Sequence, residues 1–168
     1  MKYLLQSVVF VFVLGLGITN AQKIGHINTQ ELLAIMPEAD SAQAQVEKEA
    51  KELEDQLEML QVEYNNKLEQ YNKDRDKLSE VILQTKEQEL IDYQQRIQKF
   101  RMNAEQGIQK RNQQLFQPIL DKANKAIEEV AQENGFTYIL DSGTGVLVYM
   151  SDDSKDILPM VKKKLGIQ

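Results

Sequence analysis

The 168-residue chain contains no cysteine and only one histidine, His26. The lack of cysteine excludes a disulfide framework, a thiol nucleophile, a cysteine-held zinc ion and a lipid-bearing cysteine. A single histidine gives neither a histidine-based metal cluster nor, in this chain, a Ser-His-Asp arrangement. The sequence therefore predicts a protein that is not an enzyme and that needs no metal or cofactor.

Positive charge is also in short supply. The chain has 20 Lys and Arg residues against 26 Asp and Glu residues, a formal net charge of -6. Affinity for nucleic acid comes mainly from basic side chains that neutralise phosphates. We therefore expect no nucleic acid among the partners.

The chain has one long apolar run, and it lies at the N-terminus. Lys2 precedes an apolar stretch from Val8 to Leu16, and Thr19-Asn20-Ala21 fits a cleavage site. The stretch is shorter than the roughly 20 residues that span a bilayer. We expect residues 1–21 to be a secretory signal peptide cleaved after Ala21, with no stable membrane insertion. Because Lys2 is its only charged residue, cleavage changes the net charge from -6 to -7.

Helix breakers are rare between residues 38 and 132, where only Gly107 and Pro118 interrupt a composition rich in Glu, Gln, Lys and Leu. Such a stretch is typical of long helices. Apolar residues recur at heptad spacing in both halves, at Ala50, Leu53, Leu57, Leu60 and Tyr64, then at Leu83, Leu90, Ile97 and Ala104. Two seams of similar length predict an antiparallel helical hairpin over residues 38–115.

The tip of this hairpin is expected near residues 78–83. The first seam ends there, charges cluster at 73–77, and Ser79 offers an N-cap for the returning helix. Pairing about this centre sets Tyr64 opposite Ile97 and Leu57 opposite Ala104. The acidic stretch 38–63 then faces basic residues between 96 and 111, which favours the antiparallel orientation.

The flanking segments predict a small β body made of residues 22–37 and 116–168. Residues 23–28 predict one strand, and 136–141 and 146–150 predict two more, joined as a hairpin. Pro118 predicts a kink, Asn134-Gly135 a helix end, and Asp152–Asp156 the start of a last helix. The fold class is therefore α+β, mainly α: coiled-coil arms on a small β body.

Three short strands with unpaired edges are marginal alone. We expect the body to associate with further copies through apolar side chains of the strands: Ile24, Ile27, Phe136, Tyr138, Leu140, Val146 and Val148.

The order of these elements and the residues within them resemble a known family, the Skp or OmpH family of periplasmic chaperones. The matching residues are 23–30 with Met36-Pro37-Glu38, then Pro118-Ile119, 130–131, 135–141, Val148-Tyr149, Asp156-Ile157, Val161 and Leu165-Gly166. The resemblance implies a homotrimer whose strands form a central barrel and whose arms enclose unfolded outer-membrane proteins without ATP. The best-known relatives are basic, whereas this chain is acidic, so no lipopolysaccharide site is carried over.

Four apolar residues outside the seams, together with Leu83 at the tip end of the second seam, are candidate contacts for such unfolded proteins: Met59, Val81, Ile82, Leu83 and Met102. Methionine suits this role because its side chain is flexible and polarizable. The alternative for each residue is packing against the other arm. For the whole chain, the alternative function is that of an exported structural or adaptor coiled coil of the cell envelope.

Overall fold

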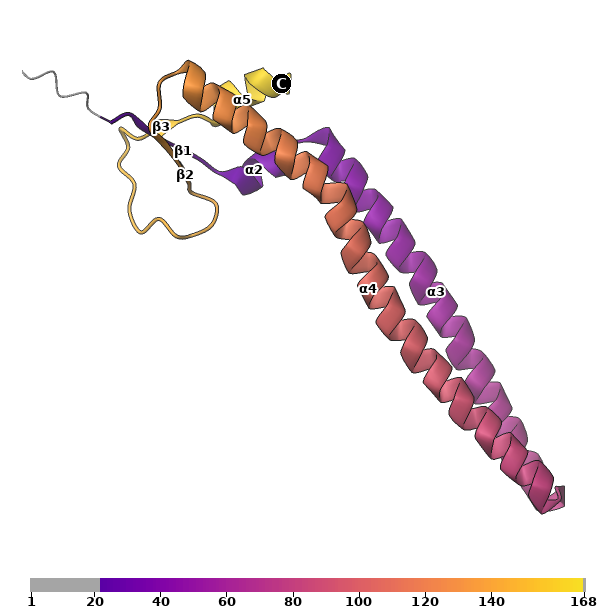
Figure 1. Ribbon diagram of the computed structural model, residues 1–168. Helices are drawn as coiled ribbons and strands as arrows, with labels where there is room; N and C mark the ends of the chain where they lie inside the picture. The colour runs from indigo at the N-terminus through magenta and orange to yellow at the C-terminus, as the bar shows by residue number, and fades with distance from the viewer. Residues whose placement is uncertain (1–21, 168) are drawn as a thin grey trace, which may run out of the picture.

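The computed structural model describes residues 22–167, and Figure 1 shows a long two-helix arm standing on a small body. The arm consists of α3 (Pro37–Asp74) and α4 (Glu80–Glu133), which run antiparallel side by side. The body contains β1 (Ile24–Ile27), α2 (Thr29–Ala34), β2 (Tyr138–Asp141), β3 (Lys155–Asp156) and α5 (Leu158–Leu165). The predicted fold class and helical hairpin are confirmed, whereas the predicted signal peptide lies outside the described residues.

The helix boundaries follow local chemistry. Asn28 caps α2 by accepting a hydrogen bond from the Glu31 amide at 3.0 Å, and Pro37 stands in the first turn of α3, where its missing amide costs nothing. α4 ends in a Schellman motif, because Gly135 adopts φ +66° and the Phe136 amide donates to the Ala131 carbonyl at 2.9 Å. The predicted helix end at Asn134-Gly135 is thus found.

The tip lies slightly earlier than predicted. A 3₁₀ turn, η1 (Arg75–Lys77), follows α3, and α4 begins at Glu80. Ser79 occupies the N-cap position, but its hydroxyl makes no capping hydrogen bond. The expected tip at 78–83 is therefore wrong by a few residues, because Val81, Ile82 and Leu83 already belong to the returning helix.

Pro118 does not interrupt α4, which is helical from Glu80 to Glu133. The proline has no amide hydrogen for the carbonyl one turn earlier, a defect that bends helices. In Figure 1, α4 changes direction as its colour turns to orange, where it leaves α3 and passes over the body. The predicted kink is a bend in one continuous helix.

The sheet differs from its prediction in one strand. β1 lies in the centre and pairs in parallel with β2 (Ile24 with Tyr138, Ile27 with Asp141) and with β3 (His26 with Asp156). The segment 146–150, predicted as a strand in a hairpin, forms no strand. Its place beside β1 is taken by β3, so the apolar segment has no strand partner among residues 22–167.

The core lies where the sheet, α2 and α5 meet the ends of α3 and α4. Its most buried side chains are Ile27, Leu32, Met36, Ile157 and Val161. Gly25 is required here, because a Cβ at this position would lie 2.9 Å from the Phe136 ring. The last helix begins as predicted, with Pro159 in its first turn and the Asp156 carboxylate accepting from the Leu158 amide at 2.9 Å.

Candidate functional site

Polar contacts between α3 and α4 fix the register of the arm. The Gln94 amide donates to the Tyr64 hydroxyl at 2.6 Å, and Lys67 donates to Glu89 at 2.7 Å. Nearer the body, the Arg111 guanidinium pairs with Glu49 at 3.2 Å, and Lys122 pairs with Glu38. Tyr64 thus lies beside Gln94, about one helical turn from the Ile97 that was expected, because the tip lies earlier in the chain.

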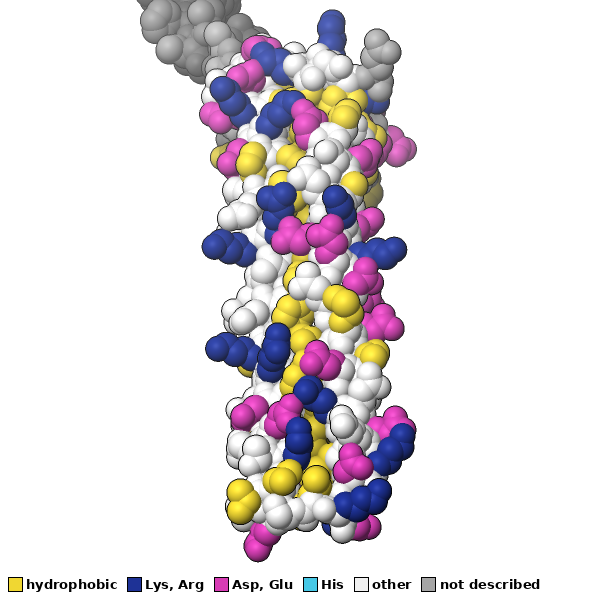
Figure 2. Space-filling view, turned by 90° about the vertical axis from the view of Figure 1, so that its right-hand side faces the viewer, with side chains coloured by type: hydrophobic (Ala, Val, Ile, Leu, Met, Phe, Trp, Pro, Cys, Tyr) yellow, Lys and Arg dark blue, Asp and Glu magenta, His cyan; other side chains and the backbone are white. Residues whose placement is uncertain are grey.

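The apolar seam of the arm is only partly covered. Figure 2 shows apolar side chains in an interrupted line between the two helices, with charged side chains on both flanks and further apolar side chains at the tip. Tyr93 and Ile97 are buried in this seam, whereas Leu57, Leu60 and Tyr64 are half-buried. Two helices cannot enclose a core, so the arm keeps apolar surface in contact with solvent.

Four of the five candidate contact residues are exposed. Val81 is 74% exposed, Met59 63% and Met102 56%, and Ile82 is exposed beside Val81 at the tip. Leu83 is half-buried and lies on the seam side. For Leu83, packing within the arm is therefore the better interpretation.

Val62 and Ile91 are further exposed apolar residues of the arm, although sequence reasoning missed them. Both lie outside the heptad seam, which is the criterion that identified Met59 as a candidate contact. Met59 and Val62 share a shallow groove on α3, and Ile91 and Met102 share another groove that lies mainly on α4.

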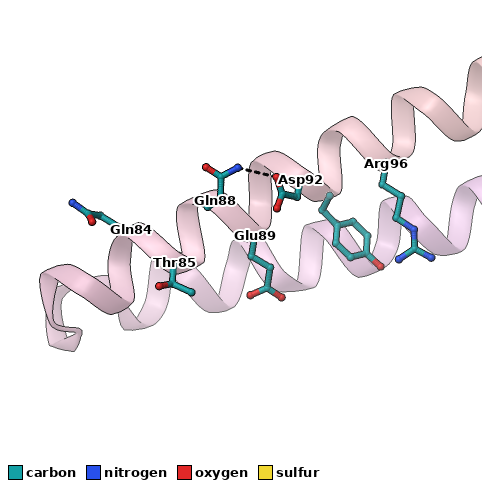
Figure 3. Close-up of a pocket in the computed structure, with 7 residues that line it drawn as sticks. Gln84, Thr85, Gln88, Glu89, Asp92 and Arg96 are labelled. Atoms are coloured by element: carbon teal, nitrogen blue, oxygen red, sulfur yellow. Dashed lines mark hydrogen bonds between the residues drawn. The ribbon is translucent and has the colours of Figure 1, made fainter.

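A third groove lies near the tip (Figure 3). Its seven residues all belong to successive turns of α4: Gln84, Thr85, Gln88, Glu89, Asp92, Tyr93 and Arg96. Gln88 donates to Asp92 at 2.8 Å. Hydrogen bonds from Lys67 and Lys86 hold the pKa of Glu89 below its ordinary value. This carboxylate therefore joins the two helices and is not poised for proton transfer.

The sheet has one covered and one open face. Gly25 and Ile27 of β1 face the core, whereas Ile24 of β1 and Tyr138 and Leu140 of β2 are exposed. The strandless segment adds further exposed apolar residues: Val146, Val148, Tyr149 and Met150. Val148 is fully exposed, so the body presents an apolar surface that the described part of the chain leaves uncovered.

The expected association residues therefore fall into two groups. Ile24, Tyr138, Leu140, Val146 and Val148 lie on the open surface. Ile27 and Phe136 instead pack in or against the chain's own core. For these two residues the prediction is corrected. Ile27 faces the core because side chains alternate along β1, whereas Phe136 precedes β2 and its ring packs against Gly25.

A polar latch joins the two ends of the chain in the body. The Thr29 hydroxyl donates to Asp141 at 2.6 Å, and the Gly143 amide donates to the same carboxylate at 2.8 Å. Burial raises the pKa of Asp141, but the hydrogen bonds from Thr29 and Gly143 outweigh this and leave the pKa below its ordinary value. The latch holds the start of α2 against the end of β2.

Within residues 22–167, His, Asp and Glu side chains do not form any cluster of three or more that could hold a metal ion. The helices of this part of the chain also lack a stretch long and apolar enough to cross a membrane.

Comparison with known proteins identifies a family and a solved structure of similar fold. Residues 23–165 match the family described as outer membrane protein (OmpH-like). A crystal structure of a candidate outer membrane chaperone (OmpH-like) from Caulobacter crescentus CB15 superposes with a TM-score of 0.72 at 12% sequence identity. The match covers 90% of this chain and 88% of that one. A sequence search among curated proteins finds no match.

Proposed function

Because the chain belongs to the OmpH-like family of outer membrane proteins, we propose that it is an ATP-independent holding chaperone for unfolded outer-membrane proteins. The observation that carries this proposal is the set of exposed apolar side chains on the arm, away from the seam. These side chains form small groups bordered by polar residues, such as Met59 with Val62 and Ile91 with Met102, an arrangement that is typical of interaction sites.

The mechanism is passive. An unfolded barrel protein exposes alternating apolar side chains and unpaired strand edges, which otherwise associate with other copies. Flexible contacts from residues such as Met59 and Met102, each weak, hold many different sequences without ordering them. Release follows when folding into the membrane becomes more favourable, so nucleotide hydrolysis is unnecessary.

Assembly as a homotrimer belongs to the same proposal. The open face of the sheet and the segment 146–150 would be covered by neighbouring copies, with Ile24, Tyr138, Leu140, Val146 and Val148 at the contacts. Three copies would then hold their arms around a shared space. The proposed location is the periplasm, after removal of residues 1–21.

The test has two measurements on the mature chain, residues 22–168. Light scattering coupled to gel filtration should give the mass of a trimer at micromolar concentration. Dilution of urea-unfolded outer-membrane proteins into buffer with the mature chain should then give less scattering than buffer alone, for several unrelated client proteins.

A matched control keeps the fold but changes the assembly surface. Tyr138→Asp with Leu140→Asp places charge on the open sheet face and should give monomers, whereas Val81→Asp at the tip should leave a trimer. Suppression of aggregation for no client, or for one dedicated partner alone, would favour the adaptor function instead.

A further inference from the structure

The two outer edges of the arm carry opposite charge around similar apolar residues. On α3, Asp55, Glu58 and Glu63 line the groove that contains Met59 and Val62; we call these five residues the acidic edge. On α4, Lys99 and Arg101 line the groove that contains Ile91 and Met102; these four residues are the basic edge. Each edge therefore combines an apolar centre with charges of one sign.

The two edges lie at the same height above the body. The contacts Glu49–Arg111 and Tyr64–Gln94 pair α3 with α4 at two levels of the arm. Met59 lies between Glu49 and Tyr64 in sequence, and Met102 lies between Gln94 and Arg111. Since both helices rise equally per residue, Met59 and Met102 stand at nearly equal distances from the body.

The edges point away from each other within one chain. Tyr64 and Ile97, which are half-buried and buried, mark the sides of α3 and α4 that face each other. Met59 and Met102 are both mostly exposed and fall on the outer sides of their helices. A single chain therefore cannot bring its own acidic and basic edges together.

Most of the charges on these edges have no ion-pair partner in the part of the chain that the structure describes. Among residues 22–167, the ion pairs join other side chains, such as Arg111 with Glu49 and Lys122 with Glu38, and do not include Asp55, Glu58, Lys99 or Arg101. These four charges are available to a partner with the complementary pattern.

We propose that the acidic edge of one copy docks against the basic edge of the neighbouring copy, which closes the ring of arms when no client is present. The inference rests on the cyclic assembly of the proposed function. In a ring of identical copies each contact joins two different surfaces, and rotation about the axis requires both surfaces to lie at equal height. The edges meet both conditions, and docking covers Met59 and Met102 in the empty protein.

This contact makes the empty and loaded states compete for the same apolar residues. A client that enters between the arms binds Met59 and Met102 only after two neighbouring arms separate. Salt screens exposed charges, with a Debye length of about 10 Å at 0.1 M. Raising the salt concentration should therefore open the empty ring while the body stays assembled.

Disulfide trapping tests the contact, because the natural chain has no cysteine. In Met59→Cys with Met102→Cys, oxidation should link each copy to the next, giving covalent trimers on a non-reducing gel. Neither single variant should give trimers. Met59→Cys with Val81→Cys is the matched control, since both positions are exposed but lie at different heights, and it should remain largely unlinked.

Charge reversal gives a second measurement. Glu58→Lys or Lys99→Glu alone should slow formation of the covalent trimer by about two- to fivefold, as expected for exposed ion pairs, and the two together should restore much of the rate. Added client should slow the trapping of the Met59→Cys, Met102→Cys variant.

The mass of each sample distinguishes failure of the docking contact from failure of the proposed assembly. A trimer by light scattering that yields no covalent trimer, or yields as much in the Val81→Cys control, would overturn the docked arms and leave the chaperone assembly standing. A monomer would overturn both the docking and the proposed assembly.

Discussion

The body and the arm of this chain bury their apolar side chains to very different extents. In the body, Ile27, Leu32, Met36, Ile157 and Val161 are each less than 2% exposed. Along the α3 side of the arm, Leu53, Leu57 and Leu60 remain half-buried although they follow a regular heptad seam. The difference shows that the body determines the stable fold, whereas the arm is a thin support that leaves apolar surface available for binding.

The largest expected effect separates the two regions by stability. Leu32→Ala removes a fully buried side chain from the body and should lower the free energy of unfolding by about 2–5 kcal/mol. Leu57→Ala on the half-buried seam should cost less than half as much. Urea unfolding followed by circular dichroism at one fixed protein concentration measures both, since the stability of an oligomer depends on concentration. Equal losses would contradict the division between body and arm.

The next effect concerns the polar latch of the body and its pH dependence. The folded state lowers the pKa of Asp141, so the latch stabilises the fold above the ordinary pKa of an aspartate. This stabilisation is lost as the pH falls through the lowered pKa of the folded state. Asp141→Asn keeps one oxygen acceptor but removes the charge, and should cost about 1–3 kcal/mol at pH 7.

The difference between wild type and Asp141→Asn should shrink as the pH falls from 5 to 2. Urea midpoints at several pH values measure this difference, and the other carboxylates cancel because both proteins contain them. Gln30→Ala, at an exposed and uncharged position beside the latch, is the matched control and should show a constant, small difference. A difference independent of pH would mean that the Asp141 charge plays no part in the latch.

The sequence predicted the arm well because its signals are local and repeated. The heptad spacing of Leu53, Leu57 and Leu60 defined the hairpin, and the scarcity of proline and glycine defined its length. The tip was placed late because it was located from the end of the first seam, whereas a 3₁₀ turn at 75–77 reverses the chain before that point and α4 begins at Glu80. A few residues of shift at the tip then moved the partner of Tyr64 by one helical turn.

The β body was harder to predict because its pairings join distant parts of the chain. β1 pairs with β2 and β3 across the whole arm. The segment 146–150 has strong strand character from Val146 and Val148, yet β3 at 155–156 takes the edge of the sheet. Similarly, alternation along β1 places Ile24 and Ile27 on opposite faces of the sheet, but composition alone does not show which face is exposed to solvent.

The smallest effect on stability is expected from substitutions of the exposed apolar residues of the arm. These substitutions test whether the arm binds clients through those residues. We consider Met59→Gln, Val81→Gln, Ile82→Gln and Met102→Gln together. Glutamine is a good helix former, so the helices should persist, and exposed substitutions of this kind usually change stability by about 0.5 kcal/mol or less each. The trimer should also persist, because these positions lie on α3 and α4 in the arm, whereas the proposed assembly surface lies in the body.

Client affinity should fall by about tenfold in this variant, because the apolar area that clients bury on the arm is lost. Raising salt from about 0.05 to 0.5 M shortens the screening length about threefold but leaves apolar burial intact. Wild-type affinity should therefore survive the change, measured with a fluorescent client at both salt concentrations. Gln56→Ala, Gln106→Ala and Gln113→Ala, at exposed polar positions on the same helices, are the control. A large loss with salt and none in the glutamine variant would instead assign client holding to the basic residues between 96 and 111.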